Sequence, residues 1–262
     1  MIVVDPDWWK TLFDEVYLLT DAKIVCNPSL TKREVDTVEK VLRLSPRHRI
    51  LDLCGGQGRH AIELARRGYG HLTVVDYTPF LLHRGRQEAI ARKLPVVFCR
   101  ADVRSTPFRS SCFDAVIMMA NSFGYFVDAH DDKLVLAEVG RIVKPGGQFL
   151  LDLTDTTFIR EHFRTESWHE TTDDVVVCWK RELVDDVIRV REMVVSKSKG
   201  LLRDRTYAER LYTQERLQAL LHDVGFASIE IQPDAFVVSP ENGADYGIAA
   251  HRMLIIASKA NR

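Results

Sequence analysis

Short apolar runs alternate with helical patterns between residues 49 and 153, and this alternation limits the possible folds more than any other feature. The runs are RILDL, LTVVD, VVFCR, AVIMMA and QFLLDL, with helical patterns between them over about 59–67, 79–92 and 131–143. Continuous apolar runs are typical of strands buried on both faces, and strands separated by helices form parallel sheets through right-handed crossovers. The alternation therefore predicts an α/β fold with a doubly wound, mostly parallel sheet.

Residues 1–45 are expected to form a helical cap beside this sheet. The pattern TKREVDTVEKVLRL over 31–44 is amphipathic, and Pro46 is expected to end its helix. Further upstream, four aromatic residues are spaced as one apolar helix face: Trp8, Trp9, Phe13 and Tyr17.

The pattern changes after Leu153. Segments DDVVVCWKREL, VIRVREMVVSKS and RDRTYAERLY show partial two-residue alternation with short turns between them, which indicates an antiparallel meander. We expect this insertion to form a lid over an active site, and a β-extension for dimerisation is the alternative. Its aromatic residues would then form an apolar pocket: Phe158, Phe163, Trp168, Trp179, Tyr207 and Tyr212.

Helix and strand patterns return after the insertion. TQERLQALLHDVGF is helical, with Thr213 as N-cap and Gly225 as C-terminal stop, and ASIEIQPDAF and HRMLIIASK are strand patterns. The predicted domains are a helical cap over 1–45, a main domain over 46–153 and 211–262, and an antiparallel lid over 154–210.

Composition narrows the function classes. The chain has 36 Lys and Arg against 37 Asp and Glu, so its net charge of −1 creates no general attraction to nucleic acid or anionic lipid. Five cysteines without CxxC spacing favour reduced thiols over disulfides or a zinc site.

MIVVDPDWWK lacks the basic start of a signal peptide, and no apolar stretch reaches the roughly 18 residues of a membrane span. We expect a cytoplasmic protein without a metal, although oxygen ligands from Asn121, Asp152 and Asp155 are an open alternative.

The first apolar run ends in ILDLCGGQGRH, a turn with few side chains. Such a turn exposes backbone N–H groups at a helix start and suits nucleotide cofactors. Gly56 to Ala61 matches GxGxxA, and Asp76 follows Gly56 by 20 residues, as a dinucleotide site requires. Asp52, however, would repel a pyrophosphate, whereas it would accept hydrogen bonds from an amino group. A nucleoside joined to an amino acid, without phosphate, fits both acids.

Five motifs carry a family resemblance. ILDLCGGQGRHAIELARRGY, LTVVDYTPFLL, CRADVRSTPF, FDAVIMMANSFGYF and RIVKPGGQFLLDL resemble, in this order, the motifs of class I S-adenosylmethionine (SAM) dependent methyltransferases. The resemblance covers about 30–153 and resumes over 211–259. It implies a seven-stranded sheet of order 3-2-1-4-5-7-6 with the last strand antiparallel. SAM would be the cofactor and S-adenosylhomocysteine (SAH) the product.

The resemblance assigns the first turn to the methionine end of SAM. Asp52, Gly56 and Gly58 would line this end. Cys54, which stands where the family more often has the first glycine of the turn, would line it with them.

Residues after the later strands would bind the rest of the cofactor. Asp76 would bind the ribose hydroxyls, for which a carboxylate with two acceptor oxygens is suited, and Tyr77 would pack on the adenosine. Asp102 resembles the acid that accepts from the adenine amino group, with Val103 at the ring edge. Asn121 would lie near the sulfonium and the substrate.

Methyl transfer from a sulfonium depends mainly on alignment. Holding the nucleophile, the methyl group and the sulfur in line can lower the barrier by roughly 7–11 kcal/mol. A general base is needed only for a nucleophile that arrives protonated. The candidates are Tyr125 after the fourth strand, Tyr17 in the cap and His169 in the insertion.

The sequence thus predicts a SAM-dependent methyltransferase acting on N or O of a small molecule, as a monomer or homodimer. NSFGYF lacks the two prolines of the Asn-Pro-Pro-Tyr type motif of nucleic-acid amino methyltransferases, which argues against nucleobase amines. Three alternatives stay open: an RNA or protein methyltransferase, an NAD-dependent oxidoreductase, and a non-catalytic SAM-binding or dimerisation module.

Overall fold

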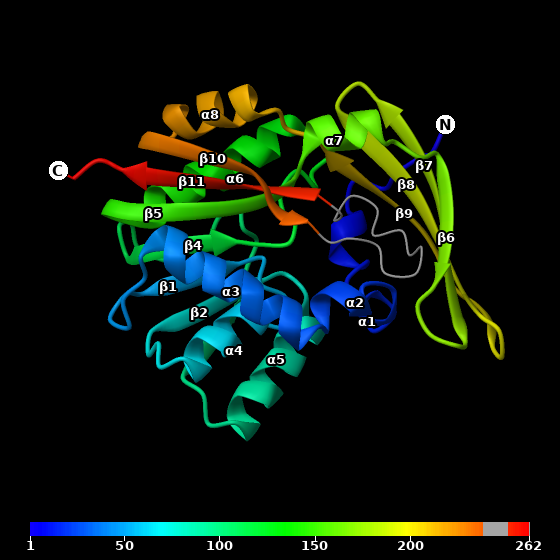
Figure 1. Ribbon diagram of the computed structural model, residues 1–262, viewed down its shortest axis with the longest axis horizontal. Coiled ribbons are helices and arrows are strands. Elements are labelled where there is room, and N and C mark those ends of the chain that lie inside the picture. The colour runs from blue at the N-terminus through cyan, green and yellow to red at the C-terminus, as the bar shows by residue number, and fades with distance from the viewer. Residues whose placement is uncertain (238–250, 262) are drawn as a thin grey trace.

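The described chain forms a seven-stranded sheet and a separate four-stranded sheet (Figure 1). A computed structural model describes residues 1–237 and 251–261. The larger sheet has the order β10-β11-β5-β4-β1-β2-β3. Its strands are β1 (Ile50–Leu53), β2 (Leu72–Asp76), β3 (Val96–Arg100), β4 (Phe113–Met118), β5 (Val143–Thr154), β10 (Phe226–Val237) and β11 (His251–Lys259). β11 pairs antiparallel with β5 and β10, and the other pairs are parallel. The predicted α/β fold and strand order are confirmed.

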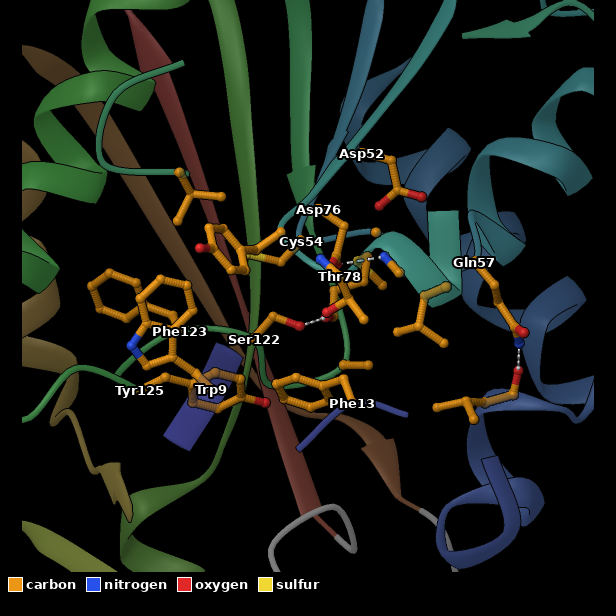
Figure 2. A pocket seen from close by; sticks show the side chains of 18 of the residues that line it. Trp9, Phe13, Asp52, Cys54, Gln57, Asp76, Thr78, Ser122, Phe123 and Tyr125 are labelled. Carbon is orange, nitrogen blue, oxygen red and sulfur yellow. Dashed lines mark hydrogen bonds between the residues drawn. The ribbon is translucent and has the colours of Figure 1, made fainter. Parts of the chain in front are cut away.

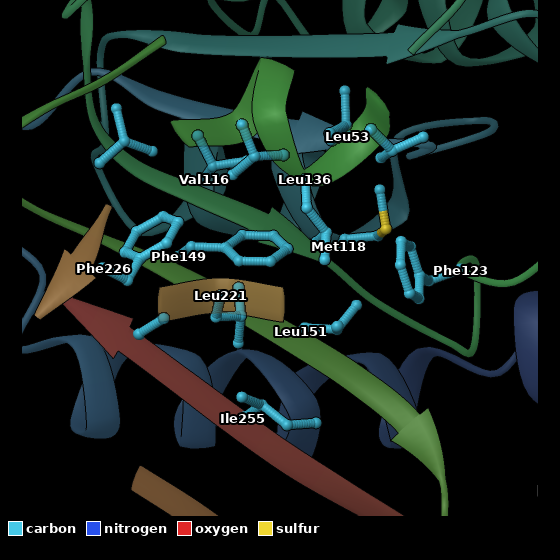
Figure 3. Close-up of a cluster of buried hydrophobic side chains, with 14 of the residues drawn as sticks. Leu53, Val116, Met118, Phe123, Leu136, Phe149, Leu151, Leu221, Phe226 and Ile255 are labelled. Carbon is cyan, nitrogen blue, oxygen red and sulfur yellow. The ribbon is translucent and has the colours of Figure 1, made fainter. Parts of the chain in front are cut away.

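Helices cover both faces of the larger sheet. One face carries α3 (Pro28–Leu42), α4 (Arg59–Arg66) and α5 (Pro79–Ala91), and the other carries α6 (Ala129–Ile142) and α8 (Gln214–Asp223). Figure 3 shows the core on the second side, where Leu136 of α6 and Leu221 of α8 approach Phe149 of β5. Burial on both faces explains why the strand runs are continuously apolar.

Helix α3 differs from its predicted limits at both ends. It begins three residues earlier, at Pro28, because the Asn27 side chain accepts a hydrogen bond from the Leu30 N–H at 3.0 Å and caps the helix. It ends at Leu42, because Arg43 adopts a left-handed conformation with φ of 46°. Pro46 therefore does not end the helix, and that prediction was wrong.

The aromatic residues of the cap do not lie on one helix, as the spacing had suggested. Asp14 Oδ1 accepts from the backbone N–H groups of Val16 and Tyr17 at 2.8 and 3.3 Å, and such local bonds compete with a continuous helix. Three short elements result: η1 (Trp8–Lys10), α1 (Tyr17–Thr20) and α2 (Ala22–Val25).

The insertion forms the predicted antiparallel sheet, with one more strand than the alternation indicated. After α7 (Thr156–Glu161) come β6 (Glu166–Glu170), β7 (Val175–Val184), β8 (Val187–Ser196) and β9 (Gly200–Arg210), paired in that order. Figure 1 shows the cap elements α1 and α2 between this sheet and the larger one. Arg203 of β9 donates to the Leu12 carbonyl at 3.0 Å and so anchors the cap to the sheet. The domain boundaries stay predictions, and residues 238–250 of the main domain lie outside the described residues.

A buried ion network joins elements that are distant in the sequence. Arg252 of β11, only 1% exposed, donates to Asp152 of β5 and to Glu34 of α3, each at 2.5 Å. Glu34 also pairs with Arg59 and lies 3.1 Å from Nε2 of His60, both at the start of α4. The network therefore fastens α3 to two strands and to α4.

Replacing Arg252 with methionine should destabilise the fold strongly. Arg252→Met keeps much of the side-chain volume but leaves buried Asp152 without its cation and Glu34 with Arg59 alone, and breaking a buried pair typically costs about 3–5 kcal/mol. Urea unfolding at pH 7 measures the loss. Arg205→Met, at an exposed position of β9, is the control, expected within about 0.5 kcal/mol of wild type. Equal losses in the two variants would contradict the assigned role of the network.

Candidate active site

The turn between β1 and α4 brings backbone close to a buried acid. Cys54, Gly56 and Gly58 have positive φ angles of 55°, 57° and 74°. A Cβ on Gly55 would lie 2.7 Å from Cγ of Asp52, so this position needs glycine. Cys54 adopts a conformation that favours glycine, which is the type the resemblance implied at this place.

Asp52 has one oxygen open to a ligand. The residue is 1% exposed, and its Oδ2 accepts from the Ala61 N–H at 3.3 Å. Oδ1 is buried and has no hydrogen-bond partner among the described residues. Burial raises the pKa of this carboxyl to about 7. A ligand ammonium group would supply both the missing donor and the missing positive charge.

Asp76 lies at the end of β2, beside the same turn. Its Oδ2 accepts from the Gly56 N–H at 2.9 Å and its Oδ1 from the Thr78 N–H at 2.8 Å. Burial raises its pKa despite these bonds. Each oxygen keeps a second lone pair, so the carboxylate can also accept from ligand hydroxyl groups.

Asp102 is held by a neighbouring arginine. Arg104 donates to it through Nη2 at 2.6 Å and through Nε at 3.0 Å. Burial raises the pKa of Asp102, but the hydrogen bonds from Arg104 outweigh this effect and keep the pKa below its ordinary value. Any adenine contact would share Asp102 with this ion pair.

A first pocket gathers most of the predicted site residues. Figure 2 shows Asp52 and Asp76 on one side and the rings of Trp9, Phe13 and Tyr125 on another. The predicted residues that line it are Tyr17, Asp52, Cys54, Gly56, Asp76, Tyr77, Asp102, Val103 and Tyr125. Gly58 does not line it, because a Cβ there would face Phe98 at 2.8 Å. Gly58 thus shapes the turn from behind.

A second pocket adjoins the first, between the cap, the end of β4 and the four-stranded sheet. Asn121 and His169 line only this pocket, whereas Phe13, Tyr17 and Tyr125 line both. The predicted aromatic wall is present in part, since only Trp179 and Tyr207 of the six residues line the pocket. Trp168 is 68% exposed, and Tyr212 lies in the core of the larger sheet.

Asn121 connects the two sheets. Its φ angle of 61° is left-handed, and its Oδ1 accepts from the Thr154 N–H at 2.9 Å. Its Nδ2 donates to Oε1 of Glu209 on β9. Glu209 is 3% exposed, and burial, partly opposed by this hydrogen bond, raises its pKa to about 8.

The candidate bases differ in their surroundings. Burial raises the pKa of Tyr17 and of Tyr125 well above the usual tyrosine value, so both phenols stay protonated at neutral pH. They can donate hydrogen bonds and exclude water. His169 is partly exposed, with its ring 4.9 Å from that of Trp179. Their catalytic roles stay predictions.

The sequence interpretation missed several charged residues of the second pocket, among them Arg181, Glu192 and Glu209. A signal was available for Glu192. On β8 the buried positions alternate as Ile188, Val190, Glu192 and Val194, so one acid interrupts an otherwise apolar face. An acid among the inward-facing positions of a strand indicates that this face of the sheet borders a polar pocket rather than an apolar core.

The described residues show neither a metal cluster nor a membrane helix. No group of three or more His, Cys, Asp and Glu side chains there is placed to hold a metal. Of the alternative oxygen ligands, Asp152 pairs with Arg252 and Asp155 caps α7. Within 1–237 and 251–261, no helix is long and apolar enough to cross a membrane.

Comparison with known proteins identifies the segment that supplies most of the lining of the first pocket. Residues 50–147 match the family model of a methyltransferase domain. A Bacillus subtilis relative that is named as a methyltransferase, YqeM, is 27% identical over 195 residues, covering 73% of this chain and 78% of the relative. UbiE of Acidiphilium cryptum, a ubiquinone/menaquinone biosynthesis C-methyltransferase, is 38% identical over 115 residues, but only 42% of this chain and 45% of UbiE align.

Several solved structures resemble nearly the whole chain, and one of them has a bound cofactor. It is SAM-bound CalS10, an amino pentose methyltransferase from Micromonospora echinaspora involved in calicheamicin biosynthesis. The superposition has a TM-score of 0.67 at 18% identity and covers 95% of this chain and 99% of CalS10. At this identity the likeness shows a shared fold, which includes the antiparallel insertion.

The charge of Asp52 should make the protein's stability depend on pH. Its folded pKa of about 7 lies above the unfolded value of roughly 3.9, so the carboxyl favours the fold while protonated and loses this contribution as the pH rises toward 7. From pH 5 to pH 8, wild type should lose roughly 3 kcal/mol relative to Asp52→Asn. Urea unfolding of both proteins at the two pH values gives this difference. If the difference in unfolding free energy between wild type and Asp52→Asn were the same at pH 5 and pH 8, the pKa of Asp52 would not be raised in the folded protein.

Proposed function

We propose that this chain, which belongs to the class I SAM-dependent methyltransferase family, transfers a methyl group from SAM to N or O of a small molecule. The observation that carries the proposal is that two pockets of different character meet at Phe13, Tyr17 and Tyr125. One has strand-end acids suited to a nucleoside joined to an amino acid. The other lies beneath the antiparallel sheet and has room for an acceptor.

The first pocket fits SAM. The open oxygen of Asp52 matches the ammonium of its methionine part, and Asp76 has lone pairs left for the ribose hydroxyls. Tyr77, Asp102 and Val103 would lie around the adenosine. When bound, SAM supplies a methyl group on positively charged sulfur. The chain then has to position the acceptor and exclude water, which enclosure by the cap and the insertion accomplishes.

Enclosure and charge support a small acceptor over RNA or protein. The second pocket is walled by the cap, by the end of β4 and by β7, β8 and β9. A macromolecule would need an open surface, and RNA would need a basic one, whereas the chain has a net charge of −1. Full-length agreement with CalS10, an amino pentose methyltransferase, supports the same choice. The match to the C-methyltransferase UbiE is confined to 42% of the chain.

Turnover tests the proposal directly. The purified protein is incubated with SAM carrying a deuterated methyl group and a bacterial metabolite extract, and the products are analysed by mass spectrometry. We expect SAH and at least one labelled small molecule. Binding of SAM without any labelled product would leave only a non-catalytic SAM-binding module, and labelled RNA or protein would shift the acceptor class.

Removing the ribose acceptor should weaken cofactor binding. Asp76→Ala is expected to lower the affinity for SAH at least tenfold, about 1.4 kcal/mol, because two hydroxyl hydrogen bonds to a carboxylate are lost. Isothermal titration calorimetry measures the change, with the exposed Asp36→Ala on α3 as control. Wild type should show no binding of NAD⁺. Tight NAD⁺ binding together with indifference to SAH would favour the oxidoreductase alternative.

A further inference from the structure

Glu209 is a buried carboxylate without a positive partner. Its side chain lines the second pocket and is 3% exposed, and its hydrogen-bond partner is the Asn121 amide. Among the described residues, no Lys, Arg or His pairs with it. Glu192 of the same pocket pairs with Arg203 at 3.0 Å, and Asp152 pairs with Arg252. Asp21 also lines the pocket and accepts from the Thr20 hydroxyl, but it is more exposed than Glu209. Ionising a buried acid without a positive partner is costly, so Glu209 holds its proton at neutral pH in the empty pocket, and a ligand that brings positive charge favours its carboxylate form.

The walls around Glu209 also suit a cation. The ring of Trp8 lies 5.2 Å from that of Tyr125 and 5.6 Å from that of Tyr207, and all three residues line the second pocket. Aromatic faces attract ammonium groups at such sites. Tyr125, which lines both pockets, and Glu209 both line the second pocket, and burial, followed by the charge of Glu209, keeps the pKa of Tyr125 well above its usual value.

We infer that the acceptor is a small amine, whose ammonium group Glu209 binds and deprotonates in the second pocket. The inference rests on the proposed methyl transfer and narrows its acceptor from N or O to an amine nitrogen. An alcohol or a carbon nucleophile would bring no positive charge to offset the negative charge of an ionised Glu209.

Methylation of an ammonium ion needs one proton transfer before the methyl transfer. An amine that arrives as an ammonium ion transfers one proton to the Glu209 carboxylate, which becomes a neutral carboxylic acid and leaves a lone pair on nitrogen. That lone pair forms the new N–CH₃ bond while the C–S bond of SAM breaks and its electron pair stays on sulfur. The products are neutral SAH and a methylated ammonium ion, and the Glu209 proton returns to solvent.

The neighbouring titratable groups are less suited to this step. Tyr125 and Tyr207 line the same pocket with phenols that stay protonated, because burial raises the pKa of both. Across the pocket, Glu192 accepts from Arg203 and from Nε1 of Trp179. Burial raises the pKa of Asp21 to about 7, but this residue belongs to the cap and is more exposed than Glu209. Burial raises the pKa of Glu209 to about 8 in the empty pocket, and a bound ammonium group would lower it, so that the ionised Glu209 can accept a proton at neutral pH.

Label position decides the chemical class of the acceptor. In the products formed with deuterated SAM, tandem mass spectrometry should place the CD₃ group on nitrogen. Label on oxygen or carbon would overturn the amine inference and leave the methyltransferase function standing. Failure to form any labelled product, with SAM binding intact, would remove the proposed function itself.

Two variants test Glu209 on the labelled amine. Glu209→Gln keeps an oxygen that can accept from Asn121 but cannot take a proton, so kcat/KM at pH 7 should fall at least tenfold while SAH affinity stays unchanged. Asp204→Asn lies on the same strand with an exposed side chain and should keep wild-type kinetics. Equal kcat/KM in wild type and Glu209→Gln would overturn the assignment.

A third measurement needs no turnover. Because the folded pKa of Glu209 lies above its unfolded value, its stabilising contribution is present in acid and lost as the pH rises toward 8. The melting temperature of Glu209→Gln should therefore rise relative to wild type between pH 5 and pH 9, with Asp204→Asn showing no such change. Parallel pH profiles for wild type and Glu209→Gln would show that Glu209 already has a compensating partner, which would refute the premise.

Discussion

The buried ion network around Arg252 fixes the part of the fold on which both pockets depend. Arg252 holds Glu34 of α3 and Asp152 of β5, and Asp152 also accepts from the backbone N–H of Ala120 at 2.8 Å. Ala120 stands two residues after the end of β4 and lines both pockets. Paired charges in a low-dielectric interior need defined geometry, so the network sets how the N-terminal segment, the sheet edge and this loop lie relative to one another.

The loop after β4 keeps an unusual backbone where the pockets meet. Ala120 and Asn121 are consecutive residues with φ angles of 57° and 61°. Left-handed conformations of residues other than glycine are strained and persist where the surroundings enforce them. Here hydrogen bonds to Asp152, from Thr154 and to Glu209 enforce them. The strain directs the Asn121 side chain toward the antiparallel sheet and couples that sheet to the cofactor side.

Three carboxylates of the site differ in how many hydrogen bonds and opposite charges the described residues supply to them. Asp76 accepts two backbone N–H groups, Asp52 keeps one oxygen without a partner, and Glu209 receives an amide but no cation. Since an ionised acid in the interior needs donors and opposite charge, the unsatisfied groups mark the places where ligand cations fit. A methyltransferase with a cationic cofactor and an amine acceptor would use both.

The sequence by itself determined the sheet, its helices and the cluster of acids at one sheet edge. These follow from local periodicity, from the glycines of the first turn, and from the rule that the carboxyl ends of parallel strands share an edge. The tertiary structure alone decided that Arg252 meets Glu34 across 218 residues and that Glu209 turns inward opposite Ile188. Long-range pairing and strand register select these partners, and no local pattern encodes them, because a shift of one residue would turn each side chain to the other face.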